Sequence, residues 1–119
     1  MQVPQSAMLL RIFTGERDRA EGQALFNAIV LKARELHIAG ATVLRGQIGY
    51  GRSTRIHRAS ALEMSEDLPV VVEIVDSEER IQAFLPVLDT MIGTHSALVT
   101  LEKVQVLRYG ADAMRAPVT

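Results

Sequence analysis

Hydrophobic and polar residues follow two different periods along this chain, and the two periods predict six elements. Patterns typical of β-strands cover residues 8–14, 42–50, 69–75 and 97–109. Between them, apolar residues recur at helical spacing in two stretches, one from Leu25 to Leu36 and one from Ile81 to Met91. The run PVVVEIV is almost continuously apolar and predicts a central, well-covered strand. The predicted order is strand, helix, strand, strand, helix, strand.

Polar residues indicate where the two helices begin and end. Asp18 with Glu21, and Asp76 with Glu79, have the spacing of capping boxes, in which each side chain accepts a hydrogen bond from an amide of the first helical turn. Gly40 is placed to end the first helix. That helix would then have about 20 residues and a length of roughly 30 Å, enough to cross one face of a small sheet.

The element order predicts an α+β fold. Two strand-helix-strand halves form a ferredoxin-like βαββαβ domain, an antiparallel four-stranded sheet with two helices on one face. Pro86 lies within the second helical pattern and predicts a kink near Ala83 or a helix broken in two. We expect residues 8–110 to form the domain, residues 1–7 a flexible leader and residues 111–119 a flexible tail. The uncovered face of an aliphatic sheet predicts an oligomer.

Composition narrows the functional classes. The chain has 119 residues, a net charge of −1 and a pI near 6.3, which argues against a general nucleic-acid binder. It has no cysteine, which excludes a disulfide framework and thiolate chemistry. The N-terminal sequence has neither the basic start nor the long apolar run of a signal peptide, so we expect a cytoplasmic protein.

The stretch from residue 40 to residue 64 combines glycines with arginines. No acidic residue occurs from Leu36 to Leu62, whereas Arg52, Arg55 and Arg58 all lie there. The first half is strand-like and the second half reads as an exposed cationic loop. Backbone N–H groups near glycines and guanidinium groups together suit phosphate or carboxylate oxygens, so an anion clamp is one interpretation. The other is a twisted hairpin with a solvated basic face.

Five sequence segments resemble a known family. LRIFTGE, AGATVLRG, GYGRSTRIH, SEDLPVVVEIVDSEE and LVTLEKVQVLRYG look like the PII-like proteins grouped as domain of unknown function family 190. The resemblance covers about residues 8–110, and a more distant one connects the chain to the nitrogen-regulatory PII proteins. It implies a compact homotrimer whose sheets line the inside. It also implies an adenine nucleotide in the cleft between neighbouring subunits.

The resemblance also implies which residues would bind that ligand. In PII proteins the end of the second strand, the turn before the last strand and an arginine near the C-terminus contribute, and the long loop, here residues 51–64, senses the ligand and touches a target. In this sequence the corresponding residues are Gly46, Gln47, Ile48, Gly49, Tyr50, Gly51, Gly93, Thr94, His95 and Arg108, with Arg52, Arg55 and Arg58 in the loop.

The chain departs from the PII pattern at two of these places. The turn from residue 93 to residue 97 has one glycine and no lysine, and Tyr109 and Gly110 follow Arg108 where a second arginine is expected. A triphosphate would therefore be poorly neutralised, so AMP, ADP or another small anion fits better. Tyr50 lies at the strand end, and the modification of a loop tyrosine known in some PII proteins is therefore not expected here.

Simpler interpretations remain open for several of these residues. Tyr50 could stack on an adenine or simply pack with its hydroxyl in water. His57 and His95 could be ordinary surface residues, and no histidine has the spacing of a metal site. Arg108 could form an ion pair with Glu102 or Glu73 in place of binding a ligand.

No catalytic motif is visible: the sequence has no Ser-His-acid order, paired-carboxylate motif, phosphate loop or zinc signature. The resemblance, together with this absence, implies a non-enzymatic regulatory protein that binds AMP or ADP and relays its occupancy through the 51–64 loop. The alternative is a ligand-independent interaction trimer that acts on a membrane channel or transporter. Members of the family it resembles often occur in genomic company with fluoride-channel genes. A small hydrolase ranks last.

Overall fold

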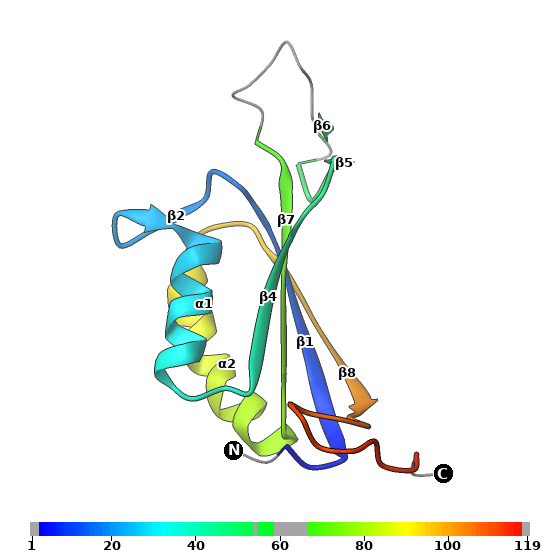
Figure 1. Cartoon of the computed structure of the whole chain (residues 1–119). Helices are drawn as coiled ribbons and strands as arrows, with labels where there is room; N and C mark the ends of the chain where they lie inside the picture. Colours follow the sequence, from blue (N-terminus) through cyan, green and yellow to red (C-terminus); the bar gives the residue numbers. More distant parts are fainter. Residues whose placement is uncertain (1–2, 54, 59–66, 118–119) are drawn as a thin grey trace.

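The computed structural model describes residues 3–53, 55–58 and 67–117 (Figure 1). Four strands form one antiparallel sheet in the order β4-β7-β1-β8. Two short hairpins, β2 with β3 and β5 with β6, lie outside that sheet. The elements are β1 (Ser6–Gly15), β2 (Arg19–Ala20), β3 (Gln23–Ala24), α1 (Leu25–Glu35), β4 (Gly40–Arg45), β5 (Ile48–Gly49), β6 (His57–Arg58), β7 (Pro69–Asp76), α2 (Glu78–Ile92) and β8 (Leu98–Gln105).

Both helices pack on the same face of the sheet, and the core lies between the two layers (Figure 1). Every second residue of β1 and β7 is buried there, as the alternating pattern requires. The predicted α+β ferredoxin-like architecture is confirmed. The core is aliphatic apart from one aromatic ring and contains Met8, Leu10, Ile12, Leu25, Ile29, Ala33, Val72, Ile74, Ile81, Phe84, Leu88 and Ile92.

The start of the first helix differs from the prediction. Residues 19–24 form the β2–β3 hairpin, with Glu21 and Gly22 at φ angles of 52° and 77° at its tip, and α1 begins only at Leu25. The Asp18 carboxylate does not cap the helix, because its Oδ2 accepts a hydrogen bond from the Gly15 N–H at 2.9 Å. The capping box of Asp18 and Glu21 is therefore wrong: both residues belong to turns that precede the helix.

The end of the first helix is also earlier than predicted. Helix α1 stops at Glu35, and the chain turns at His37, whose φ is 60°. The Ile38 N–H donates to the Ala33 carbonyl at 2.9 Å and so closes the last turn. Gly40 does not end the helix but begins β4. The helix therefore has 11 residues, and a histidine in the left-handed conformation performs the role that we assigned to glycine.

Helix α2 is capped by a residue that the pattern did not identify. Ser77 is the N-cap, and its Oγ accepts from the Arg80 N–H at 3.2 Å, so the Asp76–Glu79 capping box is wrong. Pro86 lies inside this helix, which is not divided into two. Proline leaves the carbonyl of Gln82 without its helical partner, and Gln82 is on the exposed side of the helix, where water can supply the missing bond.

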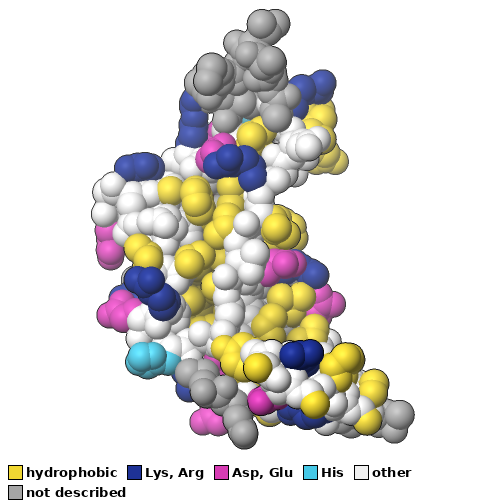
Figure 2. Space-filling view, viewed as in Figure 1, with side chains coloured by type: hydrophobic (Ala, Val, Ile, Leu, Met, Phe, Trp, Pro, Cys, Tyr) yellow, Lys and Arg dark blue, Asp and Glu magenta, His cyan; other side chains and the backbone are white. Residues whose placement is uncertain are grey.

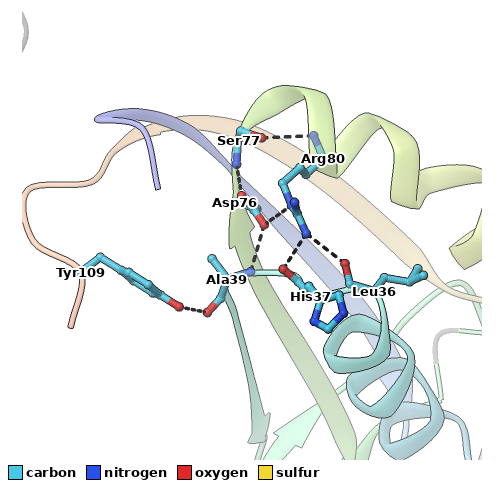
Figure 3. A network of polar contacts seen from close by, with 7 residues as sticks. All are labelled: Leu36, His37, Ala39, Asp76, Ser77, Arg80 and Tyr109. Carbon is cyan, nitrogen blue, oxygen red and sulfur yellow. Dashed lines mark hydrogen bonds and ion pairs between the residues drawn. The ribbon is translucent and has the colours of Figure 1, made fainter. Parts of the chain in front are cut away.

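Asp76 is the centre of a polar network at the end of the sheet where β7 stops (Figure 3). Its carboxylate is almost fully buried and accepts from the Ala39 N–H at 2.9 Å, the Ser77 N–H at 2.7 Å and Arg80 Nε at 3.0 Å. Arg80 Nη2 also donates to the carbonyls of Leu36 and His37. One buried carboxylate and one arginine therefore join the end of α1, the start of β4 and the start of α2.

The helix-free face of the sheet carries both apolar and charged residues. The strand register places Leu9, Phe13, Val71, Leu44 and Leu98 on this face. Near its centre Arg11 pairs with Glu73 at 2.8 Å and with Glu102. These hydrogen bonds, that to Glu73 first, raise the pKa of Arg11 above its ordinary value. The two acids that we considered as partners of Arg108 are thus bound to Arg11.

Both ends of the described chain are held by hydrogen bonds. The Arg115 N–H donates to the Leu107 carbonyl at 2.6 Å, and Arg115 Nη2 donates to the Val3 carbonyl at 2.8 Å. Tyr109 donates its hydroxyl to the Ala39 carbonyl at 2.6 Å (Figure 3). Strand β1 begins at Ser6, within the predicted leader, and β8 ends at Gln105, earlier than predicted. The flexibility assigned to residues 1–7 and 111–119 stays a prediction.

Candidate functional site

Two groups of predicted ligand residues lie at the same end of the sheet but at opposite edges. Arg45, the last residue of β4, pairs with Val70, and Leu98, the first residue of β8, pairs with Phe13. Residues 46–51 and 93–95 are therefore both at the end where β1 stops and β7 starts. The edge strands β4 and β8 are three strand spacings apart, a distance of about 14 Å.

Two of the predicted ligand glycines have a structural explanation. A Cβ on Gly46 would lie 2.9 Å from Pro69 Cγ, and one on Gly49 would lie 3.1 Å from the same atom. The Gly46 N–H also donates to the Pro69 carbonyl at 2.7 Å. These glycines let the chain pass closely over the proline that opens β7. Gly51, by contrast, faces open space.

The β5–β6 hairpin gathers the exposed cationic residues. Ile48 is paired with Arg58 across the hairpin, and Arg52 and Arg55 lie in the connection between the two strands. All three arginines are exposed, and so is Tyr50, at 69%. On the face drawn in Figure 2, several basic side chains lie near this end of the molecule, with hydrophobic side chains among them. Part of the predicted 51–64 loop, residue 54 and residues 59–64, lies outside the described residues.

The turn before β8 is tied to the segment that follows β1. His95 Nε2 lies 2.7 Å from the Arg19 carbonyl, and His95 Nδ1 lies 3.6 Å from Asp18 Oδ1. Because a carbonyl oxygen only accepts, the Nε2 atom carries a hydrogen in this contact. Gly93 and Thr94 are exposed beside it. The imidazole of His95 thus has contacts within the chain on both ring nitrogens.

On the other edge, Arg45 does not lie free. Its Nη2 is 2.6 Å from Glu16 Oε1, and the Glu16 N–H donates to the Leu68 carbonyl at 2.8 Å. The Arg17 N–H donates to Asp67 Oδ1 at 2.8 Å. The chain just after β1 is therefore bonded to the end of β4 and to the start of β7 as well as to the turn at His95.

Arg108 lies at the far end of the sheet from the other predicted ligand residues. Strand β8 ends at Gln105, opposite Ser6, so Arg108 follows it at the end where β1 starts. The length of β1, 10 residues, corresponds to about 33 Å. The Nε of Arg108 donates to the Gly110 carbonyl at 3.3 Å. One chain alone does not bring Arg108 together with residues 46–51 or 93–95, and a shared site would need Arg108 from another copy.

Neither a metal centre nor a membrane span is found in the part of the chain that the structure describes. Among those residues, no group of three or more His, Cys, Asp or Glu side chains is arranged to hold a metal ion. The same residues include no helix that is long and apolar enough to cross a membrane.

Sequence reasoning missed the residues that hold these parts in place. Asp18 and Asp76 were assigned to helix caps, whereas they bind backbone and side chains from other elements. In the sequence, Tyr109 was noted only because an arginine is expected at its position. In the structure, its hydroxyl donates to the Ala39 carbonyl and so fixes the chain after Arg108. The one signal in the sequence was an aspartate one to four residues after the end of a predicted strand, which also fits an ordinary cap.

Comparison with known proteins agrees with the sequence motifs. The family model DUF190, described as Uncharacterized ACR, matches residues 7–106. The chain is 41% identical over 99 residues to a UPF0166 protein of Aquifex aeolicus, covering 83% of this chain and 91% of that protein. It is 33% identical over 93 residues to a UPF0166 protein of Methanocaldococcus jannaschii, covering 78% and 85%.

Two solved structures of PII-like proteins have a similar fold. The nitrogen regulatory PII-like protein CPII of Thiomonas intermedia, bound to ADP, AMP and bicarbonate, superposes with a TM-score of 0.66 at 16% identity, covering 87% of this chain and 90% of CPII. A putative PII-like signaling protein of Thermus thermophilus gives a TM-score of 0.64 at 20% identity, covering 89% and 93%. Sequence motifs, family model and fold agree: the fold is that of PII-like proteins, and the chain belongs to the DUF190 family.

Proposed function

We propose that this protein is a non-enzymatic regulatory module that binds AMP or ADP and relays occupancy through the 51–64 loop. The observation that carries the proposal is the grouping of Arg52, Arg55 and Arg58 with Tyr50, all exposed on or beside the β5–β6 hairpin. Guanidinium groups bind phosphate oxygens in a bidentate manner, and an exposed tyrosine ring offers a surface for a base. CPII, which has a similar fold, was crystallised with ADP and AMP.

The charge of the site favours a nucleotide with few phosphates. The turn at residues 93–95 has no lysine, and the nearby Arg45 is already paired with Glu16. Each further phosphate would add negative charge without adding a described cationic partner. Selectivity for AMP or ADP over ATP follows, because an extra anionic group that stays unpaired on binding lowers affinity.

We infer that the working unit is a homotrimer with the helix-free sheet faces inside. Phe13, Leu44 and Leu98 are 36%, 51% and 59% exposed on that face, and apolar residues grouped on a surface are typical of interfaces. Neighbouring copies would also supply Arg108 to the residues 46–51, from which it is separated within one chain. A ligand in such a shared cleft can change the 51–64 loop only by binding one loop conformation more tightly than another.

The proposal is tested by binding measurements on the purified protein. Calorimetry with AMP, ADP and ATP should give saturable binding, tightest for AMP or ADP, at one site per chain. The variant Arg52→Ala with Arg55→Ala should lose about tenfold or more in affinity, because each charge-assisted hydrogen bond contributes roughly 1.5–3 kcal/mol. Its thermal stability should barely change, since both side chains are exposed.

A matched control removes two positive charges elsewhere. Lys32→Ala with Arg34→Ala alters the exposed side of α1 and breaks only a surface ion pair between Lys32 and Glu35. This variant should keep wild-type affinity. Equal loss of affinity in both double variants would mean that net charge alone drives binding. Unchanged affinity in the Arg52 and Arg55 variant would remove these residues from the site.

The second candidate, a ligand-independent trimer that acts on a membrane channel or transporter, is favoured by one feature of the same hairpin. Ile48, Tyr50 and Ile56 are 57%, 69% and 49% exposed, so the hairpin presents an apolar surface that a protein partner could cover. Absence of a thermal shift with any nucleotide, together with nucleotide-independent capture of a membrane transport protein, would favour this candidate. A cytoplasmic location stays a prediction.

A further inference from the structure

Residues 15–19, the bridging segment, connect β1 to β2, and they contact both the chain next to residues 46–51 and the 93–95 turn. On one side, Glu16 binds Arg45 at the end of β4 and the backbone of Leu68 before β7. On the other side, the Arg19 carbonyl binds the His95 ring. The two edges of the sheet, about 14 Å apart, are thus connected through five consecutive residues.

Asp18 is the residue on which the geometry of this segment depends. Its Oδ2 accepts from the Gly15 N–H at 2.9 Å, while Oδ1 faces His95 Nδ1 at 3.6 Å. Its backbone carbonyl accepts from the Leu25 N–H at 2.7 Å, where α1 begins. The side chain is 25% exposed, so the carboxylate lies inside the turn that it holds. One side chain therefore bonds to the start of the bridging segment and faces the imidazole of His95, with which it forms an ion pair when Nδ1 is also protonated.

We propose that Asp18 is a positioning residue of the ligand site: without touching the ligand, it holds the 93–95 turn at the distance from residues 46–51 that binding requires. This inference rests on the proposed function, because it concerns affinity for the same ligand. It adds a residue that no pattern in the sequence assigned to the site. The ligand class is an adenine nucleotide with one or two phosphates.

A positioning role and a simple charge effect of Asp18 predict opposite changes in ligand affinity when the carboxylate is removed. A carboxylate near an anionic ligand repels it, so its removal should raise affinity if charge alone mattered. Removal of a positioning group has the opposite effect, because the ligand must then supply the energy to order the turn. A fall in affinity on removing the negative charge is therefore diagnostic.

The experiment compares Asp18→Ala with Asp18→Asn by calorimetry with ADP and AMP at fixed salt. Asparagine keeps an acceptor for Gly15 and a polar group facing His95, so D18N should stay within about twofold of the wild type. D18A should lose about fivefold or more, the equivalent of one hydrogen bond. Glu21→Gln is the control: it removes an exposed carboxylate from the tip of the neighbouring β2–β3 hairpin. It should not weaken binding.

Two further measurements test whether Asp18 acts on binding through His95 and the turn before β8. In a cycle with His95→Ala, the effect of D18A should largely disappear, because Asp18 acts through that ring. In the absence of ligand, D18A should speed hydrogen exchange of the amides of residues 93–97. If D18A does not fold, Asp18→Ser replaces it, since a serine hydroxyl can serve Gly15 but is too short to face His95.

Three results would overturn the positioning role of Asp18, and a fourth would also refute the proposed function. Affinity of D18A or D18S equal to or above that of the wild type would overturn the inference while leaving the proposed function intact. Full additivity with His95→Ala, or unchanged exchange at residues 93–97, would also overturn it. Wild-type protein that binds neither ADP nor AMP would refute the proposed function and this inference with it.

Discussion

Replacing Asp76 by alanine is the sharpest test of how this fold is held together. The carboxylate is 1% exposed and accepts three hydrogen bonds, two from backbone N–H groups and one from Arg80. Through them it fixes the start of β4, the start of α2 and, by way of Arg80, the carbonyls that end α1 (Figure 3). Asp76→Ala removes all three hydrogen bonds at once.

The expected cost follows from these contacts. Hydrogen bonds to a charged group contribute roughly 1.5–3 kcal/mol each and are not additive, while breaking a buried ion pair costs about 3–5 kcal/mol. Arg80 is 40% exposed, so water can solvate its guanidinium in the variant and reduce the loss. The Ala39 N–H loses its acceptor at the start of an edge strand. We expect the free energy of unfolding to fall by about 3–4 kcal/mol.

Urea unfolding at one fixed protein concentration measures this change, because the stability of the proposed homotrimer would depend on concentration. Asp112→Ala, which removes an exposed carboxylate, is the control and should cost less than about 0.5 kcal/mol. Arg80→Ala should cost less than Asp76→Ala, and the double variant should show a coupling of about 1–3 kcal/mol. A loss below about 1 kcal/mol for Asp76→Ala would refute the role assigned to the network.

Three further variants test other parts of the structure. Gly46→Ala should destabilise the fold by about 1–3 kcal/mol, because its Cβ would lie 2.9 Å from Pro69 Cγ, and Gly51→Ala, which meets open space, should cost less than about 0.5 kcal/mol; equal urea midpoints would contradict this. Tyr109→Phe removes the hydrogen bond to the Ala39 carbonyl, just before β4, and should lower the free energy of unfolding by about 1 kcal/mol. If Arg108 binds ADP, this variant should also bind ADP more weakly. Leu98→Asp replaces an apolar residue of the helix-free sheet face by a charge, so sedimentation should detect monomers; an unchanged mass would exclude that face as the interface.

Much of the fold was predictable from the sequence because it depends on local periodicity. The almost continuous apolar run at residues 69–75 and the helical spacing after Leu25 and Ile81 placed the main strands and helices, and the antiparallel four-stranded sheet followed from the ferredoxin-like element order. The helix starts were wrong at Asp18 and Asp76. With the same local sequence, an aspartate before a helix can either cap that helix or bind a group in another element. Only the surrounding elements decide which of the two it does.

The candidate site was predictable in its residue types but not in its arrangement. The absence of acids from Leu36 to Leu62 marked the basic hairpin, and the resemblance to PII-like proteins indicated the turn and Arg108. The sequence did not indicate that Gly46 and Gly49 make room for Pro69, or that Arg108 lies at the other end of the sheet. Their roles in binding stay predictions.

The sequence by itself determined the main strands and helices, the aliphatic character of the core and the basic stretch after β4, because each depends on composition or on the pattern of neighbouring residues. Only the tertiary structure decided the partners of the polar residues. Asp67 meets Arg17 across 50 positions and His95 meets Arg19 across 76, at distances fixed by strand order and register. A carboxylate or imidazole bonds to whichever group the sheet brings within about 3 Å, and no local pattern records which group that is.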